Sequence, residues 1–241
     1  MLEKIKQNTF SHFKYLPEAV GFSVKTDQAL TIINCGLGSS MFNIVCGDCH
    51  AEKVQSVINE FKGQPFAWWI IESKALSRRL LEHGFITETE ERAMLCDLTN
   101  FKSSNNQLIR IEQVLNLDQL EHFTKVLETY DATARSFYER LTKPLLSQQE
   151  KLFVGYENNI PVVIAILFIS GDTAGIFSLI TRENKRGLGY GTQMMTHLMG
   201  TARRSGIKHT TLSASSDSGY RIYECLGFRT FGQFECFEWR G

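Results

Sequence analysis

The chain has 241 residues, 43% of them apolar, which is enough for one large domain or two small ones with a sizeable core. Lysine and arginine number 26 and aspartate and glutamate 26, so the formal net charge is zero and nothing suggests a nucleic-acid partner. The amino-terminal segment lacks the apolar stretch of a signal peptide, and the longest apolar run, Ile160–Ile169, is too short to span a bilayer, so we expect no membrane association.

The first hundred residues predict alternating strands and helices. The expected elements are a strand at Met41–Gly47, a helix at Ala51–Gly63, a strand at Pro65–Ile71, a helix at Ser73–Phe85 and a strand at Arg92–Leu98. Trp68 and Trp69 are neighbours in one of these strands and therefore point to opposite faces. We interpret both as packing residues of the core and of a lobe interface.

The segment CGDCH, Cys46 to His50, has the spacing of a c-type haem attachment motif. That attachment normally follows export, and no second ligand pair stands at zinc-finger spacing. We therefore expect neither metal nor haem, and interpret these residues as packing. Six cysteines in a chain of this length do not indicate a disulfide framework, which favours a cytoplasmic location.

The polar stretch KSSNNQ, residues 102–107, is the best candidate for a linker, and we place a domain boundary there, between 1–104 and 105–241. The second part predicts a strand at Gln107–Val114, helices at Leu117–Leu127 and Ala132–Leu145, strands at Lys151–Glu157, Pro161–Ile169 and Ala174–Thr181, a helix that ends before Gly206, a strand at His209–Ser215, a helix around Gly219–Leu226 and a strand near Phe231–Trp239. The fold class is therefore α/β (α+β), a mixed, mostly antiparallel sheet with helices on both faces.

The two parts share a strand-helix-strand-helix-strand order, and the segment LLEHGF in the first part is similar to YECLGF in the second. Eight positions missing from the first part can be placed where the second carries a glycine-rich loop. We interpret this as a degenerate internal repeat, although similar α/β patterns can also arise independently.

That loop, KRGLGYGT from Lys185 to Thr192, raises three alternatives. A P-loop requires a lysine and a serine or threonine after its last glycine, and they are missing; a dinucleotide fingerprint requires a different glycine spacing. The third pattern, Arg/Gln-x-x-Gly-x-Gly/Ala, is met by Arg186, Gly189 and Gly191 between a strand and an amphipathic helix. Free backbone N–H groups at a helix start form an anion site that suits a pyrophosphate.

Together with its surroundings, this loop resembles the GNAT superfamily of acetyl-CoA-dependent N-acetyltransferases. The resemblance runs from Phe177 to Phe228 and includes the strand ending in Thr181, the Ser-x-x-Gly turn (Ser216, Gly219) and the Tyr-x-x-x-Gly-Phe ending (Tyr223, Gly227, Phe228). It implies a GNAT-like sheet, duplicated, with 105–241 as the catalytic domain and 1–104 as a degenerate amino-terminal lobe of a two-lobed member.

The resemblance also implies roles for individual residues. Tyr223 would protonate the departing thiolate, and the backbone of Leu179, Ile180 and Thr181 would pair with the pantetheine arm. Ser216 stands where many members carry an asparagine and is the candidate for a cofactor contact there. Many members carry a glutamate in the strand before the loop as the general base, but this strand has no acid. The general base could therefore be a water chain, Asp172 or Glu235, and the sequence does not decide between them. The expected pyrophosphate amides are those of Arg186, Gly187, Leu188, Gly189, Tyr190, Gly191 and Thr192.

The expected function is therefore the direct transfer of an acetyl group from acetyl-CoA to a primary amine of a small molecule or peptide. The alternative is a non-catalytic acyl-CoA sensor or interaction module. The first lobe lacks the glycine loop, so we expect it to bind no CoA. It would instead form a wall of the acceptor site or mediate dimerisation, and a homodimer is possible. A nucleotide- or NAD-binding enzyme that uses the glycines differently is a second rival.

Overall fold

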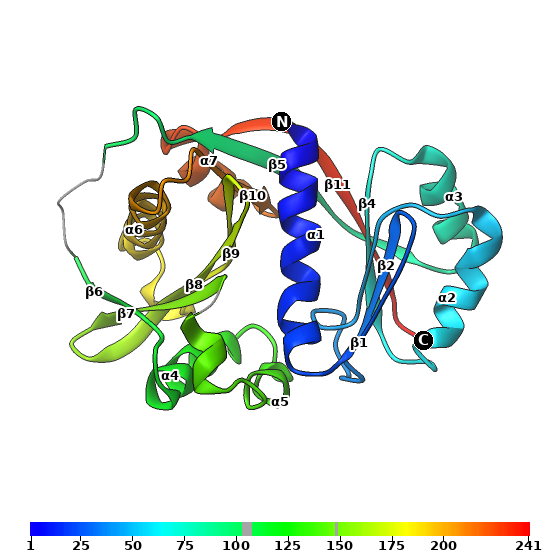
Figure 1. The fold of residues 1–241 in the computed structure, drawn as a ribbon, viewed down its shortest axis with the longest axis horizontal. Helices are drawn as coiled ribbons and strands as arrows, with labels where there is room; N and C mark the ends of the chain where they lie inside the picture. The colour runs from blue at the N-terminus through cyan, green and yellow to red at the C-terminus, as the bar shows by residue number, and fades with distance from the viewer. Residues whose placement is uncertain (103–107, 148) are drawn as a thin grey trace.

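A mixed sheet of eleven strands runs through the molecule in the order β1-β2-β3-β4-β11-β5-β10-β9-β8-β7-β6 (Figure 1). The computed structural model describes residues 1–102, 108–147 and 149–241. The strands are β1 (Ser23–Asp27), β2 (Leu30–Asn34), β3 (Ile44–Cys46), β4 (Phe66–Ile71), β5 (Ile86–Asp97), β6 (Arg110–Gln113), β7 (Glu150–Glu157), β8 (Ile160–Ser170), β9 (Thr173–Thr181), β10 (His209–Ala214) and β11 (Arg229–Trp239). Between described strands, only β3–β4 and β9–β10 pair in parallel, which confirms the mixed, mostly antiparallel sheet.

The centre of the sheet is built from strands that are distant in the sequence. β5 belongs to the first part of the chain, yet it pairs antiparallel with β10 on one side and with β11 on the other. β11 ends the chain, and its second neighbour is β4. Each half thus places its last strand beside the parallel pair of the other half, and the two halves share one continuous sheet.

Two helices, one in each half of the chain, end with the same hydrogen bonds. α3 (Lys74–Glu82) leads into Gly84 and Phe85, and α7 (Asp217–Cys225) leads into Gly227 and Phe228. Phe85 N–H donates to the Leu80 carbonyl at 3.1 Å, and Phe228 N–H donates to the Tyr223 carbonyl at 3.0 Å. Both glycines have positive φ, 88° and 93°, so both helices end in the same Schellman-type turn.

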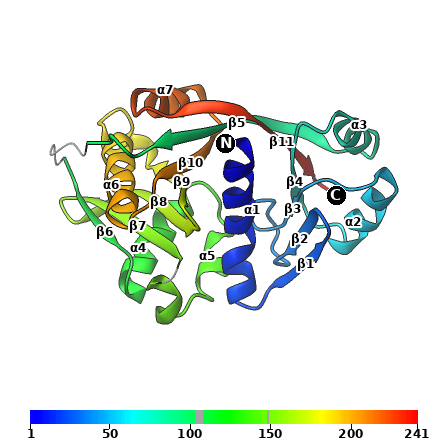
Figure 2. The same ribbon diagram turned by 45° about the horizontal axis from the view of Figure 1, so that its top comes forward.

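The helices cover both faces of the sheet, as Figure 2 shows for α6 and α4. Along β8, Val163, Ala165 and Leu167 pack with α6, whereas Ile164 and Ile166 pack with α4 and α5 on the other face. The helical elements are α1 (Leu2–Ala19), η1 (Ala51–Lys53), α2 (Val54–Glu60), α3, α4 (Leu117–Leu127), α5 (Ala134–Tyr138), η2 (Lys143–Ser147), η3 (Glu183–Lys185), α6 (Tyr190–Arg204) and α7.

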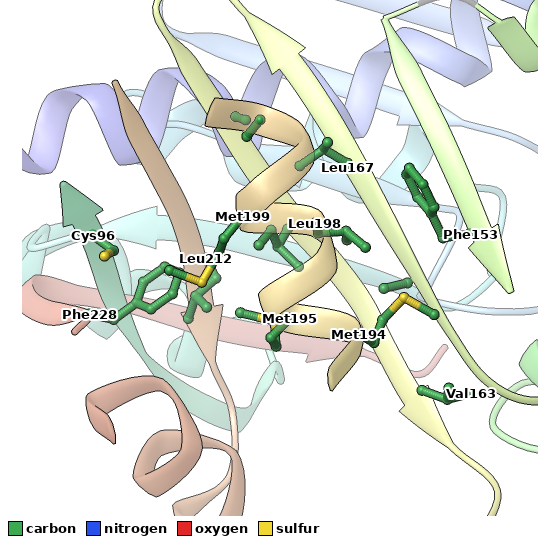
Figure 3. Close-up of a cluster of buried hydrophobic side chains, with 14 of the residues drawn as sticks. Cys96, Phe153, Val163, Leu167, Met194, Met195, Leu198, Met199, Leu212 and Phe228 are labelled. Carbon is green, nitrogen blue, oxygen red and sulfur yellow. The ribbon is translucent and has the colours of Figure 1, made fainter. Parts of the chain in front are cut away.

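The core under α6 is rich in methionine. Met194, Met195, Leu198 and Met199 are all fully buried. They point toward Leu167, Phe153, Leu212 and Phe228 on the surrounding elements (Figure 3). This packing fixes α6 against the sheet and so fixes where its amino-terminal end lies.

Several elements differ from those predicted. α1, β1 and β2 were not predicted; α1 stands between the two halves and packs on β5, β8 and β9 (Figure 1). β5 begins at Ile86, six residues earlier than expected, because pairing with β11 orders its polar first half. The helix expected at 132–145 is shorter, with α5 and a 3₁₀ turn in its place. The predicted linker at 102–107 lies almost wholly outside the described residues, and the boundary at 104/105 stays a prediction. No helix in the described ranges has the length and apolarity to span a membrane.

Candidate active site

The first feature of the site is an unpaired edge of β9. β9 and β10 pair in parallel only from Thr173 to Gly175, and β9 then continues to Thr181 paired with β8 alone. Ser178 has φ +49°, and with Leu179 it opposes the single residue Ala165 in a β-bulge. The backbone from Ile176 to Thr181, including the predicted Leu179, Ile180 and Thr181, therefore faces an open slot on its β10 side.

The glycine loop closes one end of this slot. Gly187 and Gly189 have φ +77° and +81°, a region that disfavours other residues, and no atom lies within 4 Å of a β-carbon built on Gly187. The first backbone bond of α6 runs from Gln193 N–H to the Gly189 carbonyl at 3.0 Å. In the described part of the chain, the N–H groups of residues 187–192 have no hydrogen-bond acceptor. They can therefore hold an anion.

Side chains hold the loop in place. Glu157, at the end of β7, accepts hydrogen bonds from Lys185 and from the Tyr190 hydroxyl, and these two bonds hold the pKa of its carboxyl below the ordinary value. Arg186 donates from Nε to the Thr181 carbonyl at 3.3 Å, so its guanidinium lies where the slot meets the loop. The amino-terminal end of α6 is thus tied to the strands that line the slot.

Tyr223, on α7, lines the same cavity as residues 176–180 of β9. Its half-buried side chain lines this cavity together with Ser213 and Ser215, and burial, followed by the charge of Glu91, raises the pKa of its hydroxyl to about 12. Tyr220, three residues earlier on α7, is not among the residues that line the cavity, and the Arg92 guanidinium covers its ring at 3.9 Å. Ser216 caps α7 by accepting a hydrogen bond from Gly219 N–H at 3.2 Å.

The cavity has a volume of about 580 Å³ and lies between the two halves of the chain. Its walls come from α1, β4, β5, β8, β9, β11 and the segment around α5, so both parts of the repeat build it. Trp69 lies in this wall and packs edge-on against Phe13 at 5.0 Å, whereas Trp68 is fully buried in the core of the first half. The tryptophans therefore point to opposite faces, as predicted, and one of them faces the cavity.

Five carboxylates that sequence reasoning did not single out line this cavity, and two of them, Glu91 and Glu150, lie near its aromatic and hydroxyl groups. Glu91, on β5, lies beside the hydroxyls of Thr89 and Ser213, and burial raises its pKa. Glu150, on β7, is only 2% exposed and lies 3.1 Å from Nδ1 of His12, whose ring stacks on Phe177. No local signal marked Glu91 because it lies on a strand from the other half.

Both acids that the sequence suggested as a general base lie elsewhere. Asp172 is at the β8–β9 turn, where it forms an ion pair with Lys4 at 2.5 Å. Glu235 accepts a hydrogen bond from the Ser77 hydroxyl at 2.6 Å. Neither is among the described residues that line the cavity, so neither lies next to Tyr223.

The corresponding region of the first half is closed. β3 and β4 stay paired along all of β3, and Gly47 N–H extends the pairing by donating to the Trp69 carbonyl at 3.0 Å. Leu80 occupies the position that corresponds to Tyr223. In the CGDCH segment, burial raises the pKa of Cys46 to about 12 and that of Cys49 to about 11, so both are protonated thiols near neutral pH.

Comparison with known proteins adds two findings. The sequence model of the "Acetyltransferase (GNAT) family" matches residues 111–228, which include the open edge of β9, the glycine loop and Tyr223. No curated protein matches the chain.

Solved structures with the same fold cover both halves. A GCN5-related N-acetyltransferase from Kribbella flavida has a TM-score of 0.71 at 12% identity, over 97% of this chain and 95% of that one. A conserved protein of unknown function from Staphylococcus epidermidis has a TM-score of 0.70 at 13% identity, over 92% and 95%. A tandem GNAT protein from the clavulanic acid biosynthesis pathway has a TM-score of 0.61 at 7% identity, over 88% and 78%. At these identities the likeness shows the fold alone.

Proposed function

We propose that the chain, whose residues 111–228 match the model of the GNAT family of acetyltransferases, transfers an acetyl group from acetyl-CoA directly to a primary amine. The observation that carries this proposal is the unpaired edge of β9, which lines a cavity together with Tyr223 and ends at Thr181 beside the glycine loop with its free amides. A donor with a pyrophosphate at one end and a thioester at the other matches that layout.

The donor site would consist mainly of backbone. Leu179, Ile180 and Thr181 offer N–H and C=O groups that an extended pantetheine arm can pair with, as a further strand would. The free amides of residues 187–192 lie at the amino-terminal end of α6, where the helix dipole favours the pyrophosphate. The Arg186 amide, also expected there from the sequence, donates instead to the Glu183 carbonyl at 3.2 Å. Ser216 caps α7, so its contribution to the donor site would be to position Tyr223 on that helix.

Proton transfer would involve one residue from each half of the chain. Acetyl-CoA supplies the activated thioester. The reacting amine must be neutral to attack, and Glu91 would take the proton that it loses as the new carbon–nitrogen bond forms. As the carbon–sulfur bond breaks, Tyr223 would donate its hydroxyl proton to the thiolate. Its raised pKa keeps that proton in place over the whole physiological range.

The matched variants Tyr223→Phe and Tyr220→Phe test this assignment. We expect Tyr223→Phe to lower kcat for acetyl-CoA-dependent thiol release about 10²–10⁴-fold, the usual contribution of a general acid. Tyr220→Phe, on the same helix, should retain the rate because Arg92 covers Tyr220 outside the cavity. Binding of acetyl-CoA without transfer to any amine would instead support the sensor alternative, and displacement by NAD or ATP would support a nucleotide enzyme.

The proposal also covers the cellular location of the protein, which we expect to be the cytoplasm, and the role of its first half. All six cysteines are free thiols, and four of them are buried, which suits a reducing cytoplasm. The first half would serve as a wall of the acceptor cavity, since α1, β4 and β5 all line it. We propose no CoA site there, because β3 and β4 close the slot that β9 and β10 leave open.

A further inference from the structure

The acceptor cavity carries an unusual set of charged residues. Five acidic side chains line it, and none of the described residues in its wall is a lysine or arginine. The chain as a whole has no excess of acid, with 26 residues of each sign. The acidic character is therefore local to this cavity. The residues are Glu88, Glu91, Asp131, Glu150 and Glu238.

Four of these carboxylates fall into a proximal and a distal set, and the fifth, Glu150, pairs with His12. Glu91 is the proximal one, since its charge acts on the hydroxyl of Tyr223. Glu88 and Glu238 lie on the adjacent strands β5 and β11 and share the guanidinium of Arg240, at 3.2 and 2.5 Å. Asp131 lies near this pair, because two neighbouring serines in the loop before β3 bind both: the Ser39 hydroxyl donates to Asp131 and the Ser40 hydroxyl donates to Glu238. We call Glu88, Asp131 and Glu238 the distal carboxylates.

Nearby positive charge does not neutralise the cavity. Arg240 is 65% exposed, so water screens its interaction with Glu88 and Glu238. Asp131 accepts from Thr133 N–H at 2.8 Å and from the Thr133 hydroxyl at 2.6 Å, which are neutral donors. Even with His12 protonated beside Glu150, the cavity keeps a net negative charge. An anionic acceptor would be repelled, and a cationic one attracted.

Part of the cavity wall is aromatic. Phe13, Trp69 and Phe177 line the cavity wall, and Tyr130 lies where the charges of Glu88, Glu91 and Asp131 all act on its hydroxyl. Aromatic faces attract ammonium groups and cover aliphatic carbon well.

From this cavity we infer that the acceptor is a linear aliphatic diamine or polyamine, which binds with a second, protonated amine among the distal carboxylates while its reacting amine lies at Glu91 and Tyr223. Glu88 and Glu91 are three residues apart on β5, which separates the two groups by about 10 Å along the strand. The inference rests on the proposed acetyl transfer, since that reaction defines which end of the cavity is reactive. The carboxylates themselves select the acceptor.

An acceptor panel tests the inference on the wild-type protein. The probes are diaminooctane, octylamine, aminooctanoate, spermidine and an aminoglycoside, compared by kcat/KM from thiol release. A charge-assisted hydrogen bond to the second amine predicts that diaminooctane exceeds octylamine by about 10-fold to 100-fold. Aminooctanoate should be the poorest of the linear probes, because its carboxylate would meet the distal carboxylates.

Three variants link the preference to the distal carboxylates. Glu238→Gln and Glu88→Gln should each lower the ratio of diaminooctane to octylamine. Glu90→Gln is the matched control: Glu90 is also on β5, but its side chain pairs with Gln233 and does not line the cavity, so the ratio should persist. Two independent acidic variants keep the test valid if one of them fails to fold.

The outcomes separate this inference from the proposed reaction. If octylamine or aminooctanoate is acetylated as well as diaminooctane, the acceptor class is wrong and acetyl transfer stands. The same holds if the aminoglycoside is the best substrate, or if both acidic variants keep the wild-type ratio. If no amine in the panel or in a wider set is acetylated, the proposed transfer fails, and the acceptor class fails with it.

Discussion

Replacing Glu91 with glutamine separates catalysis from stability, because we expect the reaction rate to fall while the free energy of unfolding stays the same or rises. In the folded protein Glu91 lies against the hydroxyls of Thr89 and Ser213, and burial raises its pKa above the ordinary 4.5. A raised carboxyl pKa means that folding favours the protonated form, so ionisation of Glu91 costs stability as the pH rises through that pKa. Glutamine stays neutral and can still bond to both hydroxyls.

For Glu91→Gln we therefore expect an unfolding free energy at pH 7 equal to or above that of the wild type, seen as an unchanged or higher Tm. The rate should nevertheless fall about 10²–10⁴-fold, because glutamine cannot accept a proton. In the wild type, kcat/KM should decrease as the pH falls through the raised pKa of Glu91, and the variant should lack that acidic limb. The assays are thermal unfolding and thiol release between pH 5 and 9.

The control is Glu235→Gln, which removes an acid outside the cavity and should keep both rate and pH profile. A Glu91→Gln protein with a rate within about threefold of the wild type would show that another group takes the proton. A loss of more than about 1 kcal/mol, or 2–4 °C in Tm, would contradict the stated cost of burying the ionised carboxyl.

Three further predictions concern other parts of the site. Leu198→Ala removes a fully buried side chain under α6 and should cost about 2–5 kcal/mol in thermal unfolding; a cost below about 1 kcal/mol would contradict the packing. Because the pKa of Tyr223 is raised to about 12, the rate should show no alkaline limb from this group near pH 10, where an unperturbed tyrosine titrates, and such a limb would exclude the assigned environment. Gly191→Ala places a β-carbon 3.6 Å from Thr181 Oγ1, which is an ordinary contact, so Tm should not change. Acetyl-CoA should bind more weakly to this variant in calorimetry, and an unchanged affinity would mean that the donor binds elsewhere.

Local sequence signals predicted the elements that depend on neighbouring residues. α4 spans Leu117–Leu127 as expected, with Asn116 accepting a hydrogen bond from Gln119 N–H at 2.9 Å as its cap. The glycine loop was also predictable, since the positive φ angles of Gly187 and Gly189 favour that residue type. The Gly-Phe turns after α3 and α7 explain why a weak internal repeat was visible at all.

What the sequence did not predict depends on contacts between distant segments. The first half of β5 reads as a polar stretch, ITETEE, and it becomes a strand because β11 pairs with it. The placement of Glu91 beside Tyr223 follows from that pairing and has no local signature. α1 was missed for a related reason: its buried residues, such as Ile5 and Leu16, contact strands of both halves, and they are too sparse to form a clear helical stripe in the sequence.

The central claim, that the glycine loop holds the pyrophosphate of acetyl-CoA, is tested most directly by thermal unfolding with and without saturating acetyl-CoA. Ligand at a hundred times its Kd should stabilise the protein by about 2.7 kcal/mol, or roughly 5–11 °C for a chain of this size. Gly189→Asp places a negative charge at the expected pyrophosphate and should abolish the shift. Gly171→Asp, a positive-φ glycine in the β8–β9 turn, should keep it. A full shift in Gly189→Asp, or none in the wild type, would contradict the account.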